Sequence, residues 1–446
     1  MKKNYITVKE LTAADFPPPV RFFWQNAPEA TYIRHSMLLA AIVCYCALSP
    51  RLRVKYVYDF ELSMLLLNLL CIQPSGSGKG LIRWVINLLL KQMILQDKEV
   101  RRKAREYREQ AKRKGSNKDK GEEPLVAARF LQKFTLPVIV RYADILERKY
   151  KDWMTFFLFG NELGAFIENR KASGEFQSVA RTAYSLGELY SRDTLYQDGY
   201  NAIVDIVWCS VICGQEQALE KYINKDAIVQ GDAARQILVI SDDLLGEDAP
   251  VMKPWTDEQL SIVENTVKTL MDETFTKDDE LQPIQEIDMS WLDKDVKAWC
   301  QQQRETVLKT GSRAHNSFYV RASVSAFRIA TMLWHLWTIG ENPSNAIQKK
   351  VRKCYYYFAQ YILDSALNQW GHEYEMALPK PKEMHNKQPS IYSQLPKRFS
   401  RNELRELLLK LELTCPVRTF IYKWRKAKLI YDVPDQPDVY EKLYEA

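Results

Sequence analysis

The feature that most constrains the fold is the octapeptide QPSGSGKG at residues 73–80, together with the segments on either side of it. Residues 64–72 (MLLLNLLCI) form a short apolar run with the character of a buried strand, and residues 81–95 (LIRWVINLLLKQMIL) have the apolar pattern of a helix. A buried strand, a glycine-rich loop and a helix that opens on the loop are the parts of a phosphate-binding turn.

The loop matches part of the P-loop pattern G-x-x-x-x-G-K-[ST]. In that pattern, backbone amides and the helix N-terminus hold phosphates, the lysine reaches the terminal phosphates, and the hydroxyl holds Mg²⁺. Gln73 stands where the first glycine belongs, and Gly80 stands at the hydroxyl position. The alternative is a glycine-rich turn with an incidental lysine. The nucleotide-binding residues predicted from this loop are Ser75, Gly76, Ser77, Gly78, Lys79 and Gly80.

Length and composition set broad limits on the kind of protein. A chain of 446 residues with 46% apolar residues predicts two or three domains with real cores. The net charge of +7 permits an anionic partner without requiring one. The eight cysteines have no paired spacing, which indicates buried thiols rather than disulfides or a zinc site. We find no apolar run as long as a membrane span and no signal-peptide pattern, so we expect a cytoplasmic protein with no membrane partner.

Residues 154–166 (MTFFLFGNELGAF) resemble a Walker B strand, a buried strand that ends in two acids at the edge of the sheet. In such a strand the first acid steadies Mg²⁺ and the second orients the attacking water. Asn161 replaces the first acid, whereas Glu162 keeps the second and is the predicted catalytic base. The alternative is a core strand followed by an ordinary turn.

Three further segments are predicted as buried strands: residues 138–144, 202–213 and 236–242. Gln215 follows the second of them and is predicted to reach the γ-phosphate or its water as a sensor. Arg235 precedes the third, where it is either a surface charge or a finger that completes the site of a neighbouring subunit. Five buried strands alternating with helices predict a doubly wound α/β nucleotide domain.

Two charged features allow more than one interpretation. Residues 97–124 are dense in charge, which indicates a solvated helix and loop, with a nucleic-acid contact as the alternative. In the predicted helix 318–337, Arg321 and Arg328 lie seven residues apart and share nearly one face. Either they pair with acids, or Arg328 reaches the nucleotide.

The C-terminal segment predicts a winged helix-turn-helix. Ser400 and Glu403 form a capping-box pattern before one amphipathic helix, and residues 417–430 form a second helix that is followed by a predicted hairpin. The alternative is a packing module that binds no nucleic acid. The basic residues of the second helix, predicted to contact DNA, are Arg418, Lys423, Arg425 and Lys426.

These observations predict four parts. Residues 1–50 are a helical lead-in, and residues 51–245 are a P-loop ATPase core with the charged insertion at 97–124. Residues 255–375 are a helical domain, and residues 390–446 are a winged-helix DNA-binding module. Acidic and proline-containing linkers separate them.

The order of these parts, from about Met37 to Leu443, resembles the primase-helicase-like ATPases of bacterial mobile elements and phages. These proteins lie in the RecA/AAA+ class near the virulence-associated protein E and plasmid replicative helicase groups. The resemblance rests on the SGSGK loop, the charged insertion, the NE-ended strand, the VICGQEQAL strand end and the PKRFSRNEL…IYKWRKAKLI module. It implies binding of ATP and Mg²⁺, assembly into a homo-oligomeric ring, and work on single- or double-stranded DNA in replication or transfer of an element.

Carried over to this chain, the resemblance makes Lys79 a phosphate ligand, Glu162 the base, Gln215 the sensor and Arg235 the finger. Gly80 and Asn161 depart from it, because they occupy the two usual protein anchors of Mg²⁺. Two functions therefore remain open. One is an ATP-dependent, helicase-like DNA motor. The other is a nucleotide-gated adaptor that binds DNA and a replication or transposition partner without efficient turnover.

Overall fold

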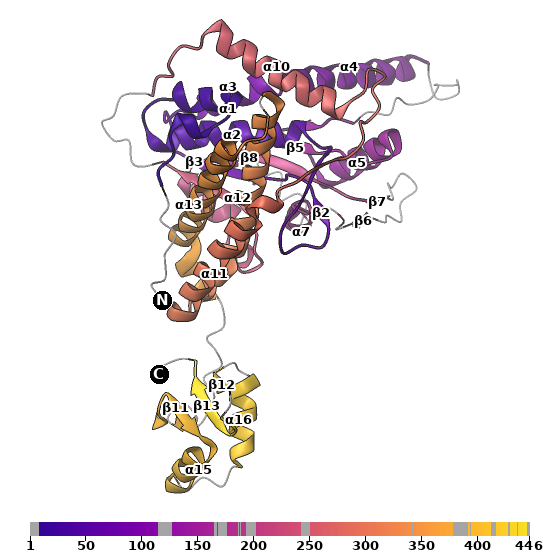
Figure 1. Cartoon of the computed structure of the whole chain (residues 1–446). Helices are drawn as coiled ribbons and strands as arrows, with labels where there is room; N and C mark the ends of the chain where they lie inside the picture. Colours follow the sequence, from indigo (N-terminus) through magenta and orange to yellow (C-terminus); the bar gives the residue numbers. More distant parts are fainter. Residues whose placement is uncertain are drawn as a thin grey trace. The chain divides into compact units, whose positions relative to one another are not determined.

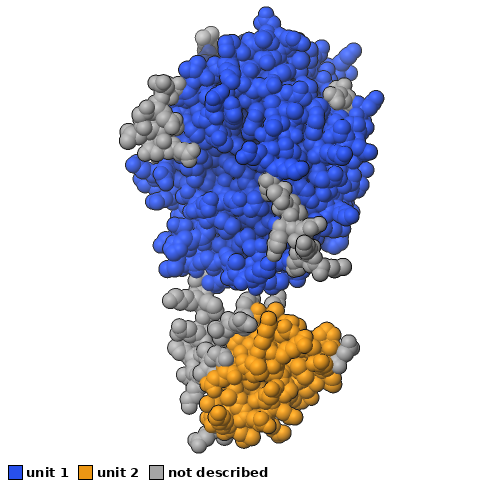
Figure 2. Space-filling view, turned by 60° about the vertical axis from the view of Figure 1, so that its left-hand side comes forward, with its two compact units in different colours: residues 1–377 blue, residues 378–446 orange. Residues whose placement is uncertain are grey.

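The structure is a computed structural model of the whole chain. It describes residues 9–114, 127–164, 167, 176–185, 187, 189–192, 202–241, 250–340, 342–377, 391–392, 394–411, 416–426, 429–434 and 436–443. The chain divides into two compact units, residues 1–377 and residues 378–446 (Figure 2). Each unit has a hydrophobic core of its own and is described separately.

Unit 1 is built around a five-stranded parallel sheet, which confirms the predicted α/β class. Side chains of the three central strands are buried, because helices cover a parallel sheet on its faces. The strands in spatial order are β4 (Phe130–Leu131), β5 (Phe156–Gly160), β8 (Trp208–Gly214), β3 (Asn68–Ile72) and β9 (Ile237–Ile240).

The prediction of a strand at residues 138–144 is wrong, because this segment lies inside helix α5 (Leu136–Tyr150). Its buried side chains recur with helical spacing at Leu136, Ile139, Val140 and Ala143. A short apolar run does not by itself distinguish a strand from a buried helix face. The edge strand of the sheet is β4 instead.

Two other predicted segments are each divided in the structure. The strand expected at residues 202–213 becomes β7 (Ala202–Val204), which pairs with β6 (Tyr190–Arg192), and then β8 in the main sheet. The helix expected at residues 81–95 becomes α3 (Lys79–Leu89) and α4 (Lys91–Lys114), with a break at Leu90. Helix α4 holds the first part of the charged insertion, and residues 115–126 lie outside the described residues.

Helix α2 (Thr31–Leu48) crosses the main sheet and packs on β5, β8, β3 and β9 (Figure 1). By length and composition it is apolar enough to span a membrane, which corrects the expectation that no apolar run is long enough. However, 89% of the helix is buried inside the structure, and a helix that is apolar all round fits such a position in a core. The described part of the chain contains no second helix of this kind.

The remaining helices of unit 1 extend this core. Helix α1 (Pro18–Gln25) packs on α2, and α10 (Asp257–Thr274) contacts α1, α2 and α3. Helices α12 (Arg313–Gly340) and α13 (Asn345–Ala377) run side by side, and α11 (Asp293–Thr310) packs on α12 (Figure 1). The shorter helices are α7 (Phe176–Thr182), α8 (Glu216–Tyr222) and α9 (Lys225–Val229), with 3-10 turns η1 (Ala13–Asp15), η2 (Ala233–Arg235) and η3 (Ser290–Leu292).

A second, three-stranded sheet borders the helices of unit 1. Its strands are β1 (Leu52–Lys55), β2 (Leu62–Ser63) and β10 (Gln285–Ile287). Strands β1 and β2 pair antiparallel, so that residues 56–61 form the turn between them.

Seven cysteines are described, and all are free and buried, as predicted for reduced thiols. Burial raises the pKa of Cys71 and Cys209, which keeps these side chains protonated. Cys415 lies outside the described residues.

Unit 2 contains β11 (Arg398–Ser400), α15 (Arg401–Lys410), α16 (Val417–Lys426), β12 (Ile430–Asp432) and β13 (Val439–Lys442). The three strands form an antiparallel sheet in the order β11-β13-β12, and the helices cover it. The predicted capping box is confirmed. The Ser400 hydroxyl accepts a hydrogen bond from the Glu403 amide at 3.2 Å, and the Glu403 carboxylate accepts one from the Ser400 amide at 2.6 Å.

Candidate functional site

The residues predicted from the glycine loop lie at the carboxyl edge of the main sheet. Ile72 of β3 is level with Gly214 of β8 and with Ile240 of β9. The register continues beyond the strands, because the amide of Gln73 donates a hydrogen bond to the carbonyl of Gly214 at 2.9 Å. The segments that follow β3 and β8 therefore emerge side by side, at the edge where open α/β sheets bind ligands.

The loop between β3 and α3 turns sharply at its two glycines. Gly76 and Gly78 have φ angles of 84° and 98°, in the left-handed region that side chains with a Cβ rarely adopt. The buried Ser77 hydroxyl donates to the carbonyl of Pro74 at 2.7 Å and closes the turn from inside. Helix α3 starts directly afterwards at Lys79, so the loop leads into a helix N-terminus.

The backbone amides of this loop are available to a ligand. In the part of the chain that the structure describes, no hydrogen bond uses an N–H group of residues 75–80 as its donor. The positive end of the helix dipole of α3 lies at the same place. Consecutive free amides at a helix N-terminus form a site for an anion such as phosphate.

Lys79 and Glu162 meet at this edge. The Lys79 Nζ atom lies 3.9 Å from the Glu162 Oε2 atom, although Glu162 follows β5 and strand β8 lies between β5 and β3. The Lys79 side chain is 13% exposed and the Glu162 side chain is 58% exposed. An ion pair of this length whose acid is exposed contributes little to stability, so both groups can act on a ligand.

Gly214 brings the two strand ends together, and its role was not foreseen from the sequence. A Cβ atom at position 214 would lie 2.5 Å from the Cβ atom of Leu163, the residue after Glu162. The absence of a side chain therefore lets the segment after β5 approach β8. The available signal was a glycine at the end of a strand, directly before the polar Gln215.

Gln73, which stands at the position of the first glycine in the P-loop pattern, is buried and anchors the loop. Its Nε2 atom donates to the Ser36 hydroxyl of α2 at 3.0 Å. Its Oε1 atom is buried and accepts no hydrogen bond from the described residues. A buried carbonyl oxygen that accepts no hydrogen bond destabilises the fold. A bound water molecule or ligand that donates a hydrogen bond to this oxygen would remove that cost.

Gln215 and Asn161 are also placed at the carboxyl edge. Gln215 is the exposed residue that precedes α8, and its side chain makes no capping hydrogen bond there. Asn161 is exposed directly after β5, one residue before Glu162. The structure therefore places four of the predicted residues at one edge of the sheet, namely Lys79, Asn161, Glu162 and Gln215, and brings the side chains of Lys79 and Glu162 close together.

Two predicted arginines lie elsewhere. Arg235 precedes β9 at the amino edge of the sheet, and its Nη1 atom donates to the carbonyl of Gly231 at 2.9 Å. Arg328 is buried, and its Nη1 atom donates to the carbonyls of Leu66 at 2.8 Å and Tyr184 at 3.1 Å. Because Leu66 precedes β3, Arg328 also lies at the amino edge. It is not part of the candidate site within this chain, contrary to the prediction that it reaches the nucleotide.

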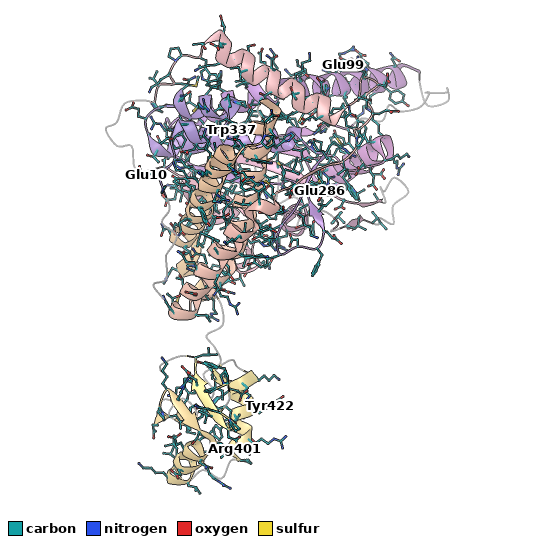
Figure 3. The ribbon with its side chains drawn as sticks, viewed as in Figure 1. Glu10, Glu99, Glu286, Trp337, Arg401 and Tyr422 are labelled. Carbon is teal, nitrogen blue, oxygen red and sulfur yellow. The ribbon has the colours of Figure 1, made fainter. Side chains whose placement is uncertain are left out.

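In unit 2 the predicted basic residues lie on the solvent side of α16, where the exposed Tyr422 is also located (Figure 3). Phe420, Ile421 and Trp424 form its buried face. Arg425 differs from the other basic residues because it forms an ion pair with Asp432 of β12. Arg418, Lys423 and Lys426 are exposed and have no ion pair with any described acid.

Comparison with known protein families finds no family that matches the chain. Comparison with curated proteins finds no significant relative.

Proposed function

We propose that the chain is an ATP-binding, DNA-associated, helicase-like ATPase that acts in replication or transfer of a mobile genetic element. The observation that supports the proposal most directly is the loop at residues 75–80, whose amides donate to no described acceptor and whose lysine lies 3.9 Å from Glu162. A phosphate chain is the anion that suits such a loop at the end of a buried parallel strand. The assignment to mobile elements rests on the resemblance in the order of parts.

Each residue at the carboxyl edge has a role in this proposal. The amides of residues 75–80 hold the phosphates, and Lys79 neutralises the charge of the terminal phosphate. Once Lys79 turns to phosphate, the Glu162 carboxylate is free to orient a water molecule and accept its proton. Gln215 contacts the terminal phosphate or that water. Arg235 lies at the opposite edge of the sheet, so it cannot reach the ATP site of its own chain. In a ring it would complete the ATP site of a neighbouring subunit.

The residues at the usual metal-anchoring positions fit Mg²⁺ poorly. Gly80 has no hydroxyl and Asn161 has no carboxylate, and among the described residues no three His, Cys, Asp or Glu side chains form a metal site. Bound with the nucleotide, Mg²⁺ neutralises phosphate charge, and here it would be held by phosphate and water. We therefore expect ATP binding to be better preserved than ATP hydrolysis.

The poor fit of Gly80 and Asn161 to Mg²⁺ also favours a second candidate function. In a nucleotide-gated adaptor, ATP binding would change the affinity for DNA or for a partner protein without turnover. Free amides and Lys79 suffice for binding, whereas hydrolysis also requires an aligned water and neutralised charge. The two candidates differ in phosphate release.

Phosphate release from ATP, measured with and without DNA, separates the candidates. We expect slow release by the protein alone, a rise when DNA is added, and loss of release in Glu162→Gln with ATP binding retained. Glu162 is 58% exposed, so this isosteric change is expected to leave the fold intact. If the wild type with DNA releases no more phosphate than Glu162→Gln does, the adaptor is the correct assignment.

Unit 2 supports the association with DNA. Its order of strand, two helices and a two-stranded hairpin is compatible with a winged helix-turn-helix, in which α16 would be the helix that enters the major groove. The hairpin adds little positive charge, because its Asp432 and Asp438 pair with Arg425 and Arg401. We therefore assign the phosphate contacts to α16.

Charge reversal on α16 is expected to weaken binding to duplex DNA. The double substitution Arg418→Glu and Lys423→Glu removes two phosphate contacts, so the slope of log K against log salt should flatten by about 2 units. Fluorescence anisotropy with a labelled duplex at several salt concentrations measures both affinity and slope. The matched control is Arg405→Glu with Lys410→Glu, which makes the same charge change at exposed positions of α15. Equal binding and slope in both double variants would remove α16 as the DNA contact.

A further inference from the structure

Unit 1 contains an open cleft of 710 Å³ at the amino edge of its main sheet, away from the glycine loop. One wall is the turn between β1 and β2, residues 56–61, and the other wall is formed by α11 and α12. The side chains that characterise it are aromatic rings and guanidinium groups, namely those of Tyr58, Phe60, Tyr319, Arg304, Arg321 and Arg328.

The aromatic side chains of the turn project into solvent rather than into the core. Phe60 is 96% exposed and Tyr58 is 54% exposed. Tyr56 anchors the turn beneath them, since it is buried and donates a hydrogen bond to the Ser323 hydroxyl of α12 at 2.8 Å. The ring of Tyr58 lies 5.8 Å from the ring of Tyr56. Rings that are so exposed leave much of their surface in contact with solvent, so this surface is available to a ligand.

The arginines of the cleft are not neutralised by acids. Arg304 of α11 and Arg321 of α12 make no ion pair with a described residue. Arg328, on the same face of α12, lies at the floor of the cleft, where two carbonyl groups hold its guanidinium group. Asp59 and Glu61 also line the cleft, on the turn, so three positive charges face two negative ones.

We propose that this cleft binds single-stranded nucleic acid. Bases stack on the rings of Tyr58 and Phe60, and phosphates lie against Arg304 and Arg321. Aromatic platforms beside basic groups are the features with which proteins hold single strands, because every unpaired base presents a ring face. A duplex hides these faces, so the cleft differs in its ligand from α16. The proposal deepens the proposed association with DNA and rests on it.

The cleft and the glycine loop can be tested separately because they lie at opposite ends of β3. Arg328 contacts the carbonyl of Leu66, before the strand, whereas Lys79 follows it. Substitution of Tyr58, Phe60, Arg304 or Arg321 is therefore expected to leave ATP binding unchanged. Loss of ATP binding and loss of single-strand binding are then distinct results.

The experiment uses the full chain with Arg418→Glu and Lys423→Glu as background, so that α16 contributes little. Anisotropy is measured with labelled dT20, rU20 and a duplex, without ATP. Tyr58→Ala with Phe60→Ala is expected to lower the affinity for both single strands at least about 25-fold, since each of the two lost stacking contacts costs at least about five-fold. Arg304→Glu with Arg321→Glu is expected to flatten the salt slope by about 1.4 units for two lost contacts.

Two controls make the test specific. Tyr58→Phe with Phe60→Tyr keeps both rings and is expected to bind like the background. Lys268→Glu with Lys349→Glu makes the matched charge change at exposed positions of α10 and α13 and is expected to leave the slope unchanged. The proposal is overturned if the cleft variants bind dT20 and rU20 as the background does, or if they lose duplex and single-strand affinity equally. If the chain fails to bind ATP but still binds single strands through the cleft, the proposal for the cleft is supported. Only the proposed ATP site is then refuted.

Discussion

Replacement of Lys79 by alanine is expected to weaken ATP binding by roughly 30-fold or more, because a charged partner of phosphate is worth about 2 kcal/mol or more. The Lys79 side chain is only 13% exposed, and its Nζ atom faces Glu162 at the mouth of the loop. In the variant the backbone amides remain, so weak binding persists while the charge of the terminal phosphate is uncompensated. Isothermal titration calorimetry with ATP measures the difference.

The matched control for this substitution is Lys91→Ala. Lys91 is the exposed first residue of α4, on the chain shortly after the loop but not in it. It is expected to bind ATP like the wild type. Glu162→Gln, which removes the negative charge opposite Lys79, should bind ATP at least as well as the wild type. Unchanged affinity in Lys79→Ala would show that the loop is a structural turn and not a phosphate site.

Restoration of the two missing metal anchors is expected to raise ATP turnover. The double substitution Gly80→Ser and Asn161→Asp supplies the hydroxyl and the carboxylate that the pattern requires. Position 80 can accept a side chain, because no atom lies within 4 Å of a Cβ placed there. Asn161 is exposed and aspartate has the same shape. A gain of roughly ten-fold requires about 1.4 kcal/mol of transition-state stabilisation, which is modest for a well-held metal.

The gain must depend on both the metal and Glu162. The same double substitution combined with Glu162→Gln is expected to give no increase, and Gly80→Ala with Asn161→Ala tests whether side-chain bulk alone has an effect. Steady-state phosphate release at several Mg²⁺ concentrations is the measurement. Rapid hydrolysis by the unmodified protein as an isolated monomer would contradict this prediction. It would show that fast turnover needs neither a hydroxyl at position 80 nor a carboxylate at position 161.

Local patterns predicted the elements whose stability is decided within a few residues. The Ser400–Glu403 capping box formed as expected, because its two hydrogen bonds connect residues three apart. The buried face of α16 followed its 3.6-residue period, since the spacing of apolar side chains determines which face meets the core. The turn at Gly76 and Gly78 likewise needs only residues that tolerate a positive φ.

Short apolar segments were less predictable. Residues 138–144 form part of α5, whereas β4 consists of only Phe130 and Leu131 at the edge of the sheet. Both segments are apolar, and which of them joins the sheet depends on pairing with β5, a contact between distant parts of the chain. Apolar content alone does not contain that information.

The sequence by itself determined that a glycine loop follows a buried strand and opens a helix, because those features are local in the chain. Only the tertiary structure decided which distant side chains serve it. The strand order carried Glu162 to Lys79 across β8, and the absence of a side chain at Gly214 allowed the approach. The same packing took Arg328 to the opposite edge, where two carbonyl groups hold its buried charge. A buried guanidinium group needs hydrogen-bond acceptors around it. Here the acceptors belong to segments that are distant in the sequence, so only the folded chain brings them together.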